Sequence, residues 1–240
     1  TMSILTVAGI PIRLHSSFLL LGGALVAWEA ATAGGAAAFS ALVYGLLLFG
    51  SVLVHELGHA LTGRWFGVQT KDITLYPFGG VARMAMARLS PGAEAAIALA
   101  GPLTNVLIAL GAGLLVWAGW SSAMSLLVIN IALAVFNLVP AWPMDGGRGL
   151  RSVLSIVLGE ARSGELALGF SRLLAWAMVL GGAYYSLWSL ALVGAFLLLM
   201  IRAERTRLRH QAVDAPQGPS RWSEPEDEQR ARLSFPHPTR

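Results

Sequence analysis

Long apolar stretches dominate this chain of 240 residues. The longest stretches without Asp, Glu, Lys or Arg include residues 30–54, 95–144 and 173–201. Because about 20 apolar residues cross the hydrocarbon core of a bilayer, this pattern predicts transmembrane helices. The first four spans are expected near residues 16–33, 37–65, 94–118 and 123–139. Residues 165–200 are long enough for two further minimal spans, or for one span and a shallow segment.

Shorter segments between these spans show other patterns. Residues 67–86 are too polar to cross a membrane and are rich in β-branched and aromatic residues, which predicts a hairpin or small sheet. Residues 10–14 alternate like a short strand, and residues 146–162 have the apolar spacing of an interfacial helix. The predicted fold is therefore an all-α polytopic membrane protein with about six transmembrane helices and a small membrane-associated β element.

The composition is typical of a membrane protein, and it differs between two parts of the chain. Hydrophobic residues make up 55% and charged residues 12%, against roughly 25% charged residues in soluble domains. The net charge of +4 is too small and too scattered to favour nucleic acid, so the expected surroundings are a lipid bilayer. Residues 1–205 are expected to form a membrane-embedded domain, and residues 206–240 a polar, disordered cytoplasmic tail.

Basic residues predict the orientation in the membrane. In the six-span interpretation the outer loops lie near residues 29–36, 119–122 and 182–188, and none of them contains Lys or Arg. The positive-inside rule then places both termini in the cytoplasm.

The sharpest chemical signal is the sequence His55-Glu56-Leu57-Gly58-His59. Two histidines at positions i and i+4 lie one helical turn apart and can chelate one zinc ion, while Glu56 can take a proton from a water that the zinc activates. The alternative is a buried polar patch that bonds neighbouring helices. Three ionisable groups within a lipid span are costly, which favours the metal site.

A catalytic zinc needs a third protein ligand, and the chain contains no cysteine. Asp145 is a better candidate than the remaining histidines, because it follows Pro140 and Pro143 and precedes two glycines. The prolines end the fourth span, and irregular backbone at membrane depth is tolerated where it lines a polar cavity. The alternative is that Asp145 caps the next helix. Asp72, in the polar connection after the second span, is expected to be solvated.

Three motifs together resemble the site-2 protease family of intramembrane zinc metalloproteases. They are HELGH, the sequence Gly101-Pro102-Leu103-Thr104-Asn105, and the segment NLVPAWPMDGG that ends at Gly147, and they occur in the family's order. The resemblance covers about residues 4–205. Residues 9–15 and 76–81 resemble its six-span, sporulation-protease-like branch. Leu138 and Met144 stand where the family motif often has Pro and Leu.

The resemblance implies His55, His59 and Asp145 as zinc ligands, Glu56 as general base and Asn137 as a polar group near the scissile carbonyl. For Asn137 the alternative is a bond between helices, and for Asn105 close helix packing is the favoured interpretation.

The function implied is cleavage of peptide bonds in or near the transmembrane segment of a membrane-protein substrate. The expected location is a bacterial or archaeal cell membrane. The alternatives are a metal-ion transporter, since transporters also place ionisable residues at depth, or a catalytically inactive membrane-binding relative.

Overall fold

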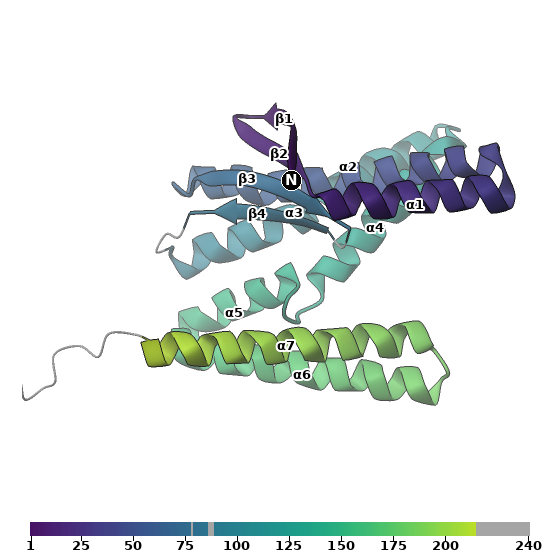
Figure 1. Cartoon of the computed structure of the whole chain (residues 1–240). Helices are drawn as coiled ribbons and strands as arrows, with labels where there is room; N and C mark the ends of the chain where they lie inside the picture. Colours follow the sequence, from purple (N-terminus) through teal and green to yellow (C-terminus); the bar gives the residue numbers. More distant parts are fainter. Residues whose placement is uncertain (78, 86–88, 215–240) are drawn as a thin grey trace, which may run out of the picture. The chain divides into compact units, whose positions relative to one another are not determined.

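Figure 1 shows the computed structural model, which describes residues 1–77, 79–85 and 89–214. Residues 1–201 form one compact unit, and a second unit begins at Arg202. The helices are α1 (Ser16–Ala33), α2 (Gly35–Trp65), α3 (Pro91–Trp117), α4 (Met124–Leu138), α5 (Asp145–Leu158), α6 (Glu160–Tyr184) and α7 (Trp188–Asp214), with a 3-10 turn at Ser121–Ala123. The strands are β1 (Met2–Val7), β2 (Ile10–Leu14), β3 (Thr70–Tyr76) and β4 (Gly79–Met84).

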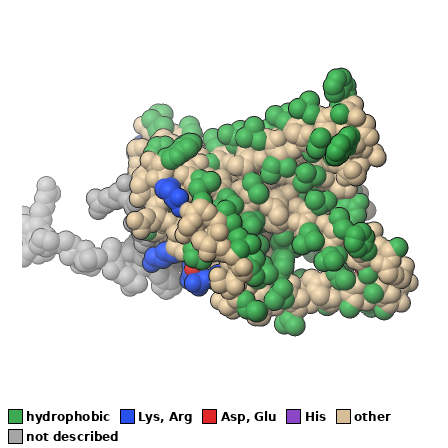
Figure 2. All heavy atoms as spheres, turned by 90° about the horizontal axis from the view of Figure 1, so that it is seen from above, with side chains coloured by type: hydrophobic (Ala, Val, Ile, Leu, Met, Phe, Trp, Pro, Cys, Tyr) green, Lys and Arg blue, Asp and Glu red, His purple; other side chains and the backbone are tan. Residues whose placement is uncertain are grey.

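The predicted fold class is confirmed. Among the described residues, five helical segments are long and apolar enough to cross a membrane, and they are Ser16–Ala33, Gly35–Trp65, Pro91–Trp117, Ser121–Leu138 and Arg162–Tyr184. Large hydrophobic side chains are exposed along these helices, and they cover much of the face in Figure 2. Such an outward apolar surface is stable in contact with lipid and unfavourable in water.

The two stretches near the C-terminal end, one predicted as an interfacial helix and one left open, are both helical. Residues 165–200 contain parts of two helices, because α6 ends at Tyr184 and α7 begins at Trp188. The expected interfacial helix is α5, but it ends at Leu158; Gly159 has a φ of +79°, and α6 starts at once after it. The tail expected from residue 206 stays a prediction, since α7 continues to Asp214 and residues 215–240 lie outside the described residues.

The small β element is a four-stranded sheet in the order β1-β2-β3-β4. Strands β2 and β3 pair in parallel, because the helical hairpin of α1 and α2 separates them in sequence and returns the chain to the same end. The sheet packs on α2 through a core in which Ile10, Ile12 and Ile73 surround Ala60. The sheet therefore lies against the end of α2 that carries the HELGH sequence.

Asp72 is not solvated, contrary to the expectation from the sequence. It lies in β3 with 2% of its surface exposed, and Arg83 of β4 donates hydrogen bonds to both of its carboxylate oxygens. Arg13 of β2 lies 3.5 Å from the same carboxylate. The Arg83 guanidinium holds the pKa of Asp72 below its ordinary value. The ion pairs thus join three neighbouring strands.

Candidate metal centre

The helix α2 presents His55 and His59 on one face, because residues four apart are neighbours on a helix. Both are buried, with 5% and 3% of their surfaces exposed. The glycine between them permits the close approach of α3: a Cβ atom built on Gly58 would lie 2.8 Å from Thr104 Cγ2. On α3, a Cβ atom built on Gly101 would lie 2.7 Å from His55 Nε2 and closer still to His59. The two helices therefore leave room for the imidazoles only because these positions lack side chains.

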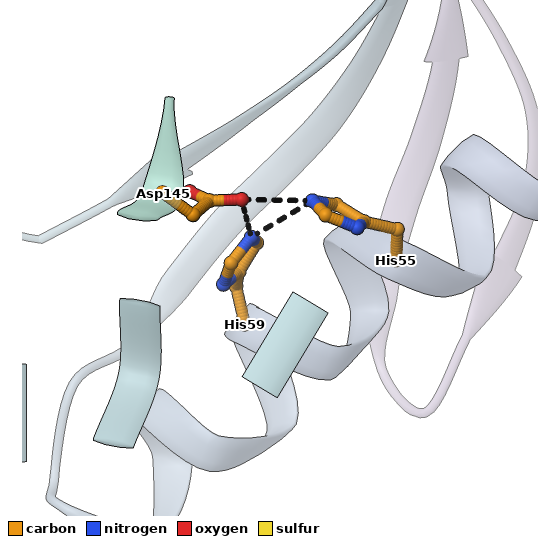
Figure 3. Close-up of side chains that lie close together, drawn as sticks. All are labelled: His55, His59 and Asp145. Atoms are coloured by element: carbon orange, nitrogen blue, oxygen red, sulfur yellow. Dashed lines mark hydrogen bonds and ion pairs between the residues drawn. The ribbon is translucent and has the colours of Figure 1, made fainter. Parts of the chain in front are cut away.

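Asp145 reaches the histidines from the first residue of α5 (Figure 3). Its Oδ2 atom lies 3.0 Å from His55 Nε2 and 3.1 Å from His59 Nε2, and the two Nε2 atoms are 3.1 Å apart. The N-cap position of α5 is Met144, and no side-chain cap is made there, so the carboxylate is not used as a helix cap.

These three atoms fit the first coordination sphere of zinc. A tetrahedral ion with bonds of about 2.0–2.1 Å holds its ligand atoms roughly 3.3 Å apart. Two imidazole nitrogens and one carboxylate oxygen are a donor set that zinc accepts, and three protein ligands leave a position for a reactant. His55, His59 and Asp145 therefore form a potential zinc site, as the sequence predicted.

Each of these three side chains makes a further contact on its other side. His59 Nδ1 lies 2.6 Å from the carbonyl oxygen of Ile97, and His55 Nδ1 lies 2.6 Å from Asn105 Oδ1. Arg148 lies 3.7 Å from the second oxygen of Asp145. The helix-packing role expected for Asn105 agrees with its contacts, which join α3 to His55 on α2 and to Asn130 on α4. Its direct contact with a residue of the potential zinc site was not expected. The signal in the sequence is its spacing: Asn105 lies one turn after Gly101 and so on the same face of α3.

The other two predicted site residues are placed differently. Glu56 is half-buried and close enough to His55, His59 and Asp145 to interact electrostatically, and the backbone of Ala82 in β4 hydrogen-bonds its carboxylate. The Asn137 amide donates a 3.0 Å bond to the carbonyl of Leu133 within α4, so its catalytic role stays a prediction.

Known proteins are similar to this chain in sequence. The sequence pattern of peptidase family M50 matches residues 43–121 and 114–181. A zinc metalloprotease of Methanocaldococcus jannaschii is 38% identical over 184 residues, covering 73% of this chain and 52% of the relative. Rip3 of Mycobacterium tuberculosis is 34% identical over 241 residues, covering 87% of this chain and 60% of the relative. The chain thus spans little more than half the length of these relatives.

A solved structure shows the same fold. The site-2 protease from Methanocaldococcus jannaschii superposes with a TM-score of 0.58 and 31% identity, covering 85% of this chain and 94% of that one. The matched family segments contain both histidines and Asp145. The chain is a membrane protein that belongs to peptidase family M50, the family of the site-2 proteases.

Proposed function

We propose that this chain is an intramembrane zinc metalloprotease that hydrolyses peptide bonds in or near the transmembrane segments of membrane proteins. The observation that carries the proposal is the meeting of His55, His59 and Asp145 atoms about 3 Å apart, on helices whose outer surfaces are apolar. Glu56, one residue along from the first ligand, supplies the base that such a site needs.

The residues divide the chemistry between them. Zinc, when bound by His55, His59 and Asp145, would polarise a carbonyl group and lower the pKa of a water molecule. A carboxylate oxygen of Glu56 takes the proton from the attacking water and returns it to the leaving amine. The Asn137 amide donates a hydrogen bond to the developing oxyanion. Arg148 holds one oxygen of Asp145 and so leaves the other directed at the histidines.

Cleavage of single-span membrane proteins by the purified full chain tests the proposal. We expect cleavage that a chelator abolishes and added zinc restores. Glu56→Gln should keep its zinc but cleave about 10²–10⁴ times more slowly, because general acid–base catalysis contributes about that factor. Substantial cleavage by Glu56→Gln at full zinc content would contradict the assignment of the base.

The same measurement separates the protease from a metal transporter. A transporter would move zinc across vesicle membranes without cleaving any protein. Wild type and Glu56→Gln would then both show no cleavage. Among the described residues, His55, His59 and Asp145 are the only group of three potential metal ligands, whereas a transport path needs successive sites.

We also propose that both termini face the cytoplasm. The loops at the other end, around residues 119–122 and 185–187, contain no Lys or Arg. The positive-inside rule assigns such loops to the outside.

A further inference from the structure

The metal centre is connected to a chain of buried side-chain hydrogen bonds that crosses three helices. Asn105 on α3 lies between His55 on α2 and Asn130 on α4: its Oδ1 is 2.6 Å from His55 Nδ1, and its Nδ2 donates a 2.8 Å bond to Asn130 Oδ1. Both asparagines are fully buried. Polar groups with no access to water need partners, so each contact restricts the next.

The donor and acceptor of each hydrogen bond in this series are determined at the end away from His55, where backbone carbonyl groups accept. Asn130 Nδ2 donates to the carbonyl oxygen of Leu126 (2.9 Å) and to Ser51 Oγ (3.0 Å). Ser51 in turn donates its own hydrogen to the carbonyl oxygen of Leu47 (2.7 Å). Backbone carbonyls accept hydrogen bonds and never donate them, so Asn130 must present its NH₂ group to Leu126 and its oxygen to Asn105.

The same reasoning determines the state of His55. Because Asn130 offers an oxygen, Asn105 must present its NH₂ group to Asn130 and its oxygen to His55. An amide oxygen only accepts, so His55 Nδ1 must carry the hydrogen. In the neutral imidazole the lone pair then lies on Nε2, the atom directed at His59 and Asp145.

His59 reaches the same state by a simpler route. Its Nδ1 faces the carbonyl oxygen of Ile97, which acts as an acceptor without any help. His55 Nδ1 instead lies against the side-chain amide of Asn105, which could face either way. The Asn130 and Ser51 contacts therefore matter for one of the two histidines only.

We propose that Asn105, held in one orientation by Asn130, is a positioning residue that sets the tautomer of His55 and thereby prepares its Nε2 atom for zinc. The inference rests on His55 being a ligand in the function proposed above. A reversed Asn105 amide would put the hydrogen on Nε2 and block the site. Outer partners of metal-bound histidines typically change metal affinity by about 10–100-fold.

Zinc affinity, measured on the full chain in detergent by competition with chelators of graded strength, tests the proposal. We expect Asn105→Leu to weaken zinc binding by about 10–100-fold. Asn105→Asp should bind close to wild type, because a carboxylate still accepts from Nδ1. Asn130→Leu should also weaken binding, although it touches no ligand. Ser163→Ala, which removes an equally buried hydroxyl bonded to Glu160, is the control and should bind as wild type.

A second readout separates positioning from a structural role. The visible spectrum of the cobalt-loaded protein reports ligand geometry, and we expect it to change in Asn105→Leu and in Asn130→Leu but not in Asn105→Asp. The thermal stability of the metal-free protein should fall in all three, since each loses a buried bond. A purely structural role would lower this stability and leave affinity and spectrum unchanged.

The possible failures are distinguishable. If wild type and His55→Ala bind zinc equally, His55 is not a ligand and the proposed function is at fault. If wild type binds zinc through His55 but both leucine variants bind as tightly, the positioning role is overturned. If Asn105→Leu does not fold, the other two variants still test the proposal. Weaker zinc binding by Asn105→Asp would contradict it. Unchanged zinc binding by Asn130→Leu would also contradict it.

Discussion

Two buried aspartates illustrate how the partners of a residue decide its role. Asp72 is surrounded by arginines, which neutralise it and leave it no free oxygen for a metal. Asp145 directs one oxygen at two histidines, while Arg148 stands 3.7 Å from the other. The first carboxylate can hold strands together, and the second can bind a cation.

Asp145→Ala should therefore lose zinc. We expect its affinity to fall by more than the roughly 10–100-fold that an outer partner contributes, because a direct ligand is removed. Elemental analysis after gel filtration measures the zinc content. Asp72→Ala is the matched control, since it also deletes a buried carboxylate; it should be less stable but keep its zinc. Equal zinc content in the two variants would place the third ligand elsewhere.

The lowered pKa of Asp72 makes its ion pairs sensitive to acid. A carboxylate with a folded-state pKa below its unfolded value of 3.8 stabilises the fold above that pH, and the contribution is lost as pH falls through the folded-state pKa. Wild type should thus have a higher melting temperature than Asp72→Asn near neutral pH. The difference should shrink once the pH drops below about 4, as thermal unfolding in detergent at each pH would show. A pH-independent difference would mean that Asp72 stabilises by packing alone.

At the scale of elements, the site forms where α3 and β4 lie close to α2. Helix α3 comes near at Gly101, and β4 comes near at Gly80, where a Cβ atom would lie 2.5 Å from Glu56 Cγ. The two glycines therefore face different parts of the machinery, since one borders the ligands and the other borders the base.

Substituting these glycines should separate zinc binding from catalysis. Gly101→Ala should lose zinc, because the new methyl group meets both imidazoles. Gly80→Ala should keep zinc but cleave more slowly, since the flexible Glu56 side chain gives way and the base is displaced. Gly111→Ala, on α3 with nothing within 4 Å, should match wild type in both respects. Zinc content and cleavage rate, measured on the same samples, check all three outcomes.

Some elements of the structure could be predicted from the sequence and others could not. Spans such as α1 followed directly from apolar length, and the HELGH and DGG motifs indicated the three residues that meet in the potential metal site. The parallel pairing of β2 with β3 was not predictable, because it depends on contacts between residues about 60 positions apart. The burial of Asp72 was missed for the same reason: Arg83 and Arg13 are brought to it by the sheet.

At the scale of the whole molecule, the number of spans decides where the C-terminal end lies. In the part of the chain that the structure describes, five helical segments meet the criteria of length and hydropathy. Helix α7, whose apolar part ends at Ile201, is not among them. If α7 also crosses the membrane, the two ends of the chain lie on the same side.

Single cysteines can test this, because the chain has none of its own. Cysteines at Ala33 and Ser121 should react with an impermeant reagent on intact cells. Those at Gln69 and Gln211 should react only after permeabilisation, if six helices cross. Gln69 is chosen for this loop because the nearby Gly67 has a φ of +79°, which would strain any side chain. Labelling of Gln211 from outside would indicate five spans.

The residues of the candidate metal centre lie far apart along the chain, with 90 positions between His55 and Asp145. During synthesis the ribosome releases α2 first, so both histidines enter the bilayer before Asp145 exists. The third ligand arrives only after α3 and α4 have been inserted and the chain has folded back at Pro140 and Pro143. A nascent molecule therefore carries an incomplete site until the membrane domain is almost finished. Under the proposed function, a chain that is still being synthesised could not yet cleave protein, because its site is incomplete.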